Sequence, residues 1–163
     1  MTTDAPLALY EDEVRPEWID LNGHMNVAYY VLAFDYATDR FFTHVGVGAR
    51  YLEEKRHSMF ALEAHVTYQR ELHAGDPLRV ATRLLGYDAK KLHFFHQMYH
   101  TTEGYLAATS EWLGLHIDMR ARRSAPFPDA IAARLAAIRE THAGLPVPPE
   151  VGRVIGLASR SKP

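Results

Sequence analysis

The sequence contains no cysteine among its 163 residues. This absence excludes disulfide bonds, thiolate nucleophiles and cysteine-bound zinc, and it fits a reducing compartment. No apolar run approaches the roughly 20 residues that a membrane-spanning helix needs, and the first residues lack the pattern of a signal peptide. Charges of opposite sign nearly cancel, with 18 Lys and Arg against 20 Asp and Glu. We therefore expect a cytoplasmic protein with neither a nucleic-acid nor a membrane partner.

The length and composition are typical of one globular domain. Hydrophobic residues make up 47% of the chain, which is enough for a substantial core. No internal repeat or domain boundary is visible. We expect a single domain over residues 1–163, with a tail rich in proline and glycine from about residue 145.

Two segments have helical periodicity. Between residues 27 and 45 the apolar side chains recur at helical spacing, with many aromatic residues among them, which predicts one long and largely buried helix. Residues 46–57 begin with glycines and continue with charges, which is typical of a surface connection. A shorter helix is predicted within 126–144, with Asp129 as its cap and Gly144 as its end.

The remaining ordered segments have the character of strands. A short strand is predicted at 7–14, and long ones at 58–72, 78–87, 92–102 and 105–119, several of them joined by short polar turns. Long strands with short turns favour a strongly curved antiparallel sheet. The helix at 27–45 would fill its concave face. The expected fold class is α+β.

The segment "DLNGHMN", residues 20–26, concentrates polar chemistry immediately before the long helix. A helix cap needs only one polar side chain, so simple capping by Asn22 or Asn26 does not account for the whole cluster. A carboxylate at Asp20 can act as general base or nucleophile, while N–H groups from Gly23 through Met25 to Asn26 can stabilise an oxyanion. These parts suit the hydrolysis of an acyl compound.

The loop "DLNGHMNVAYY" resembles that of hot-dog fold thioesterases, in particular the hydroxybenzoyl-CoA thioesterase-like branch. In that branch the aspartate of D-x-x-G is the catalytic carboxylate, and this position is Asp20. In plant acyl-carrier-protein thioesterases an Asp-x-Asn-x-His pattern carries catalysis, and it corresponds to Asp20, Asn22 and His24. The resemblance implies a small-molecule acyl-CoA substrate, no cofactor and no metal. It also implies a homo-oligomer, dimer or tetramer, whose active site a neighbouring subunit completes.

Further segments, "LGYDAKKLHFFHQMYH", "ATSEWLGLHIDMRARRSAPFP" and "VPPEVGRVIGL", resemble thioesterases of carnitine degradation that act on betainyl-CoA. This resemblance implies a short cationic acyl group, which aromatic side chains attract through cation–π interaction. Trp18, Tyr29 and Tyr30 are the aromatic candidates for the substrate pocket. Glu63 and Glu111 are carboxylates that could balance the charge.

Basic residues follow the strand ends. They could bind the phosphates of coenzyme A, or form only a solubilising rim. Ten histidines are present, but none has the helical spacing of a metal site, so no metal is expected. The basic candidates are Lys90, Lys91, Arg120, Arg122 and Arg123.

Three alternatives remain open beside the cationic acyl-CoA thioesterase. The first is a general or hydroxybenzoyl-type thioesterase, because aliphatic and aromatic acyl groups also fit an apolar pocket. The second is a dehydratase that acts on a hydroxyacyl thioester with His24 in the cleft. The third is a non-catalytic protein of the same fold that binds acyl-CoA. Release of free thiol separates the thioesterases from the other two.

Overall fold

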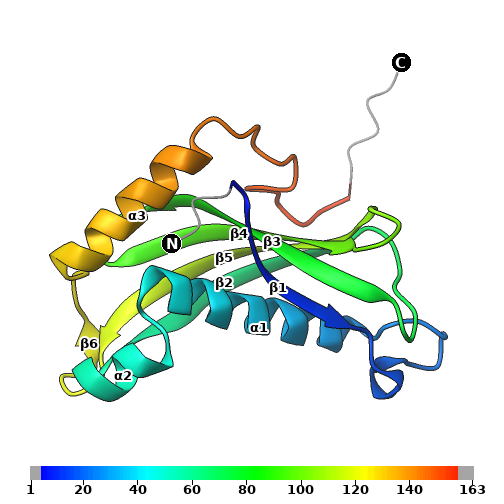
Figure 1. The fold of residues 1–163 in the computed structure, drawn as a ribbon, viewed down its shortest axis with the longest axis horizontal. Coiled ribbons are helices and arrows are strands. Elements are labelled where there is room, and N and C mark those ends of the chain that lie inside the picture. Colours follow the sequence, from blue (N-terminus) through cyan, green and yellow to red (C-terminus); the bar gives the residue numbers. More distant parts are fainter. Residues whose placement is uncertain (1–4, 158–163) are drawn as a thin grey trace.

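A computed structural model describes residues 5–157 and shows a curved antiparallel sheet wrapped around one long helix (Figure 1). The strand order is β1-β3-β4-β5-β2, and the short β6 pairs with β5. The predicted arrangement of sheet and helix is confirmed. The elements in chain order are β1 (Leu7–Glu13), a 3₁₀ turn (Pro16–Trp18), α1 (Val27–Val45), α2 (Ala49–Lys55), β2 (His57–Tyr68), β3 (Pro77–Tyr87), β4 (Lys91–His100), β5 (Leu106–Asp118), β6 (Arg123–Ser124) and α3 (Asp129–His142).

Helix α1 spans the predicted residues and lies against the concave face of the sheet. Asn26 caps it, because its side-chain oxygen accepts a hydrogen bond from the N–H of Ala28 at 2.9 Å. Gly46 ends it in the left-handed region, at φ 98°. The side chains of Phe34 and Phe41 are fully buried in the core. The helix is thus fixed at both ends and along one face.

One buried polar group ties α1 to the sheet. His96 of β4 is completely buried, and its two ring nitrogens lie 2.9 Å from the hydroxyl oxygens of Thr38 and Thr82. Burial lowers the pKa of His96 to about 3, so the imidazole is neutral near pH 7. A neutral imidazole can donate one of these hydrogen bonds and accept the other, which satisfies the group without a charge.

Strand β2 forms one edge of the sheet. It pairs with β5 along its whole length, and no other strand of the described residues pairs with its outer side. Phe60 and Leu62 are exposed to 47% and 51% on this strand. A long edge with exposed apolar side chains is a template for pairing with another chain.

The structure corrects four local predictions. The expected surface connection at 46–57 contains helix α2. Gly48 precedes this helix, and Arg56 ends it in the left-handed region, where the N–H of Arg56 donates to the carbonyl oxygen of Leu52. Asp129 is not the cap of α3, because Pro128 occupies that position and the carboxylate makes no capping bond. Ala143 rather than Gly144 ends the same helix. The second predicted strand stops at Tyr68, four residues early.

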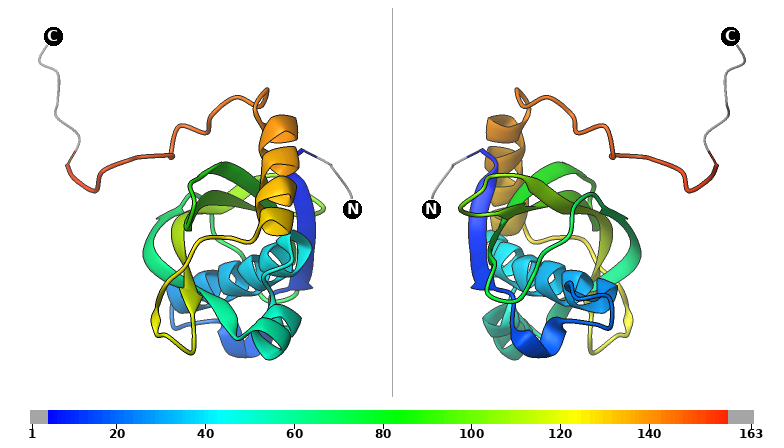
Figure 2. Two further views of the ribbon diagram at one scale, coloured as in Figure 1. Left: turned by 90° about the vertical axis from the view of Figure 1, so that its left-hand side faces the viewer. Right: turned by 90° about the vertical axis from the view of Figure 1, so that its right-hand side faces the viewer.

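Helix α3 and the tail cover the outside of the molecule near β3 (Figure 2). The N–H of Leu84 donates to Nδ1 of His142 at 3.0 Å, and the guanidinium of Arg83 donates to the carbonyl oxygen of Leu145 at 2.7 Å. The tail then runs along the sheet, where the N–H of Gly152 donates to Glu111 at 2.7 Å. Residues 158–163 of the predicted tail lie outside the described residues. No helix of the described chain is long and apolar enough to cross a membrane.

Candidate active site

The carboxylate of Asp20 is held at the start of α1 by two hydrogen bonds. Oδ1 accepts from the backbone N–H of Asn22 at 2.8 Å, and Oδ2 accepts from the side-chain amide of Asn26 at 3.4 Å. Gly23 adopts φ 81°, which closes the turn between them. The loop therefore presents a half-buried carboxylate next to the positive end of the helix dipole.

The backbone N–H groups predicted to bind an oxyanion are already used. The N–H of Gly23 donates to the carbonyl of Asp20, that of Met25 donates to Leu72 at 2.7 Å, and that of Asn26 donates to Trp18 at 2.9 Å. In this structure the three N–H groups are therefore not free to bind an oxyanion.

Val27 supplies an alternative donor. It is the first residue of α1, and within residues 5–157 its N–H has no hydrogen-bond acceptor. Its side chain is 55% exposed, so the start of the helix is open to a ligand. The structure thus moves the candidate oxyanion donor from the loop to the first N–H of the helix.

A pocket of about 380 Å³ opens beside this helix start. His24 lies in its wall, with Nε2 3.7 Å from the carboxylate of Glu71 and Nδ1 3.3 Å from the carbonyl oxygen of Met25. The imidazole is not hydrogen-bonded to the carboxylate of Asp20, and the side chain of Asn22 points to solvent. The lining residues are His24, Met25, Val27, Tyr30, Tyr68, Gln69, Arg70 and Glu71.

Sequence reasoning missed Glu71 and Arg70 in this pocket. The polar stretch "QREL" that follows β2 was the available signal, but residues up to 72 were assigned to the strand. Because the chain leaves the sheet after Tyr68, this stretch folds back toward the loop. The N–H of Met25 bonds Leu72 there, and Glu71 reaches His24.

The aromatic candidates divide between core and pocket. Trp18 is only 2% exposed, with its ring stacked on Tyr29 at 5.5 Å and the guanidinium of Arg15 4.7 Å from the ring centroid. It therefore offers no free face to a ligand. Tyr30 is among the residues that line the pocket. Its hydroxyl accepts from the N–H of Leu72 at 3.0 Å, and burial raises its pKa to about 12.

The two glutamates predicted for the substrate pocket lie on the convex face of the sheet. Glu111 lies 2.6 Å from Nε2 of His93, and its second oxygen accepts from Gly152. Glu63 lies on the same face, near His65 and the tail. Strand alternation separates both glutamates from α1 and from the Asp20 loop. The structure does not bring them to the candidate active site.

The five basic candidates gather at the opposite end of the sheet from Asp20. Lys90 ends the turn between β3 and β4, where its carbonyl oxygen accepts from the N–H of His116, and Lys91 begins β4. Arg120, Arg122 and Arg123 surround the turn between β5 and β6. Since β4 spans roughly 30 Å, these side chains lie far from the Asp20 loop of their own chain.

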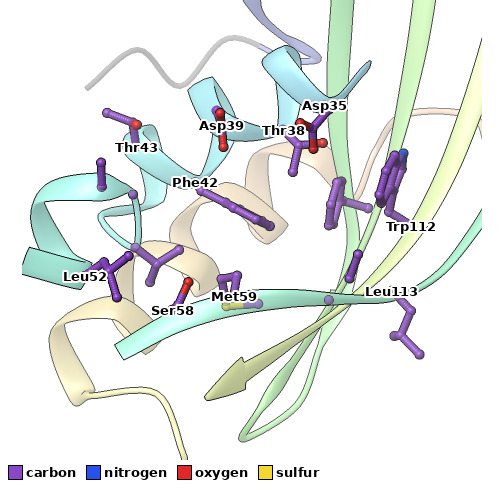
Figure 3. Close-up of a pocket in the computed structure, with 16 residues that line it drawn as sticks. Asp35, Thr38, Asp39, Phe42, Thr43, Leu52, Ser58, Met59, Trp112 and Leu113 are labelled. Carbon is purple, nitrogen blue, oxygen red and sulfur yellow. The ribbon is translucent and has the colours of Figure 1, made fainter. Parts of the chain in front are cut away.

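A second cavity, of about 370 Å³, was not predicted (Figure 3). It lies between the second half of α1, α2 and strands β2 and β5. Aromatic rings line its interior, and two acidic side chains of α1 stand at its rim, where the sequence shows them as polar interruptions of an apolar helix. The lining residues are Asp35, Thr38, Asp39, Phe42, Thr43, Val47, Gly48, Ala49, Leu52, Ser58, Met59, Ala61, Phe94, Trp112, Leu113 and Gly114.

Comparison with known proteins identifies a matching family and similar proteins. Residues 14–135 match the family described as "Thioesterase-like superfamily". The chain is 44% identical over 151 residues to a betainyl-CoA thioesterase of Pseudomonas aeruginosa, covering 93% of this chain and 95% of that protein.

Two further similarities extend over almost the whole chain. An L-carnitine dehydrogenase/betainyl-CoA thioesterase of Rhizobium meliloti is 34% identical over 96% of this chain, which matches only 31% of that longer protein. A Staphylococcus aureus protein solved in complex with CoA is 30% identical, with a TM-score of 0.86, covering 93% of this chain and 96% of that one.

Proposed function

Because the chain belongs to the thioesterase-like superfamily and is a hot-dog fold thioesterase, we propose that its substrate is betainyl-CoA, which it hydrolyses to the free acid and CoA. One observation carries the choice of acyl group, namely the 44% identity to a betainyl-CoA thioesterase along nearly the full length of both chains. The proposed reaction consumes only water, and we propose that Asp20 and the N–H of Val27 carry it without a cofactor or a metal ion.

The geometry at the start of α1 supports a mechanism centred on Asp20. The N–H of Val27 would donate to the thioester carbonyl oxygen and stabilise the negative charge that develops there. Asp20 would either remove a proton from the attacking water or attack the carbonyl itself and form an anhydride that water then opens. In both routes the C–S bond breaks, and the CoA thiolate leaves and takes up a proton.

We also propose that the protein works as a dimer formed along β2. Antiparallel pairing of two β2 edges would cover the exposed Phe60 and Leu62. It would also turn the basic end of one chain toward the Asp20 loop of the other. Lys90, Lys91 and the three arginines could then meet the phosphates of a CoA molecule whose thioester lies in the neighbouring chain. The lack of cysteine supports a cytoplasmic location.

The function is tested by release of free thiol from a panel of CoA thioesters at matched concentration. We expect betainyl-CoA to have the highest kcat/KM, well above acetyl-CoA and benzoyl-CoA. A higher value for benzoyl-CoA would favour the hydroxybenzoyl type. Hydration of an enoyl thioester without thiol release would favour a dehydratase. Binding of CoA esters without any turnover would favour a non-catalytic protein.

A further inference from the structure

The tail that follows α3 is anchored at successive points on the convex side of the sheet. Near its start, the buried guanidinium of Arg83 on β3 donates to backbone carbonyl oxygens of the tail. Further along, the side-chain amide of Gln69, just beyond β2, donates to the carboxylate of Glu150 at 3.0 Å, and the N–H of Gly152 donates to Glu111 of β5. The tail therefore passes from β3 to β5 and β2, the last strands on this side of the sheet.

The last described residues of the tail, 154–157, form an exposed apolar segment, which we call the arm. Val154 lines a cavity that Glu63 and His65 of β2 also line, so the arm begins beside the edge strand. Figure 2 shows this part of the chain leaving the body of the molecule on the side of β2. Apolar side chains that gather on a surface mark an interaction site. Those of the arm are Val154, Ile155 and Leu157, which are 85%, 85% and 101% exposed.

An apolar patch lies on the convex face of the same two strands. Phe60 of β2 pairs with Leu115 of β5, and directly opposed residues of antiparallel strands share one face. That face is the convex one, because Leu115 follows the outward Glu111 by four positions on a regularly paired stretch of β5. Leu113, between them, also points away from α1 (Figure 3). We call Phe60, Leu113 and Leu115 the edge patch.

The arm does not cover the edge patch of its own chain. Phe60 is still 47% exposed, and Ile155 and Leu157 are almost fully exposed, although the arm begins beside residues of the same strand. One chain thus presents two open apolar surfaces close to one free sheet edge. A two-fold dimer, in which each surface of one copy meets the other surface of the second copy, buries both of them twice.

We infer that the arm of each subunit docks on the edge patch of a second copy of this chain, across the joint between the two β2 strands. The contact rests on the β2-paired dimer of the proposed function. Pairing of the two edges protects Phe60 from the side but leaves its outer face open. The arm lies over that face, and two-fold symmetry supplies two such contacts in each dimer.

The dimensions of the sheet fit this contact. If the two-fold axis passes through the middle of β2, the region of His65, where the arm begins, lies opposite the region of Phe60 in the second copy. Neighbouring strands are about 4.8 Å apart, so β2 and β5 of the second copy lie roughly 5 and 10 Å beyond the edge. Three extended residues, 155–157, span about 10 Å. The arm is therefore long enough to reach both Phe60 and Leu115 of the second copy.

Disulfide trapping tests the contact, because the chain has no cysteine of its own. A Leu157→Cys chain is mixed with an affinity-tagged Leu115→Cys chain, subunits are allowed to exchange, and the mixture is oxidised. We expect a mixed disulfide between the two chains, at least tenfold more abundant than with Val147→Cys in place of Leu157→Cys. Val147 is an exposed apolar residue of the same tail that precedes the contacts of Glu150 and Gly152, so it is the matched control. A disulfide that forms only within a chain carrying both cysteines would overturn the contact.

Sedimentation measures what the arm contributes to the dimer. Ile155→Ser combined with Leu157→Ser should raise the dissociation constant of the dimer at least tenfold, whereas Val147→Ser should leave it unchanged. Thiol release per dimer should be the same in all three proteins. A dimer whose dissociation constant does not change, and which gives no mixed disulfide, would overturn the arm contact and leave the paired dimer and the thioesterase intact. A wild type that sediments as a monomer at every concentration would overturn the dimer and the arm contact together, while thiol release tests the reaction separately.

Discussion

The concave and convex faces of the sheet have opposite character, although neighbouring residues supply them. On β5, Trp112 turns inward to the cavity beside α1, while Glu111 turns outward and holds the tail through Gly152. On β4, His96 is buried and neutral between two threonines, while His93 meets Glu111 at the surface. Side chains that are neighbours in the sequence are therefore separated onto opposite faces of the sheet. Only the concave side adjoins Asp20.

The largest effect is expected at the start of α1. Asp20→Asn keeps the shape and the hydrogen bond from Asn22 but removes the basic carboxylate, so kcat should fall by roughly a thousandfold or more. Thiol release measures the activity, and thermal unfolding should show a folded protein close to wild-type stability. Turnover near that of the wild type would remove Asp20 from the mechanism.

The buried histidine of the concave face should make stability depend on pH. The folded state holds the pKa of His96 at about 3, below the value of about 6.5 expected in the unfolded chain. The unfolded state then binds more protons between these values, so stability is lost as the pH falls from 6.5 toward 3. The slope approaches roughly 1.4 kcal/mol per pH unit.

Denaturant unfolding of the wild type and of His96→Gln at several pH values checks this prediction. The variant should lose about 2 kcal/mol near pH 7, because the threonine hydroxyls on both sides lose a matched partner. It should also show a shallower slope between pH 6.5 and 4. Equal slopes for both proteins would show that His96 is not the group responsible.

Trp18 tests whether a buried aromatic residue beside the active loop contributes to recognition. Because the ring is 2% exposed, Trp18→Ala should cost about 3 kcal/mol of folding stability. The ratio of kcat/KM for betainyl-CoA to that for acetyl-CoA should stay the same. A selective loss of the cationic substrate would place Trp18 in the substrate site, contrary to its buried position.

The smallest effect is expected on the convex face. Glu111→Gln weakens the contacts to His93 and Gly152, so the tail at 145–157 should exchange amide hydrogen faster. The value of kcat/KM should change less than twofold. A loss of activity approaching that of Asp20→Asn would show that the convex face takes part in the reaction.

Prediction from the sequence succeeded where the signal is periodic and local. The helix at 27–45 agrees with the structure residue for residue, since nineteen positions carry one consistent pattern between Asn26 and Gly46. The five longer strands were recovered with ends displaced by a few residues, whereas the two-residue strand β6 was not predicted. Helix α2 was missed because its seven residues, four of them charged, have too little periodicity to distinguish a short helix from a turn.

The candidate site was only partly accessible to the same reasoning. The cluster from Asp20 to Asn26 was found because it breaks the pattern just before the helix. The acceptors of its N–H groups could not be predicted, because the N–H of Met25 donates to Leu72 and that of Asn26 donates to Trp18 only after the chain has folded back. Glu63 and Glu111 were predicted to be carboxylates that balance the charge of a cationic acyl group. The sequence did not say which face adjoins Asp20.

The sequence by itself determined the helix within a curved sheet, the position of the reactive loop and the class of reaction. These features depend on side-chain periodicity and on residues that are neighbours in the chain. The tertiary structure decided that Val27 is the open donor, that Trp18 belongs to the core, and that Asp35 and Asp39 stand at an aromatic cavity. Those outcomes depend on hydrogen bonds and packing between residues distant in the chain, such as Met25 and Leu72. No local sequence pattern specifies which distant residue will lie beside a given side chain.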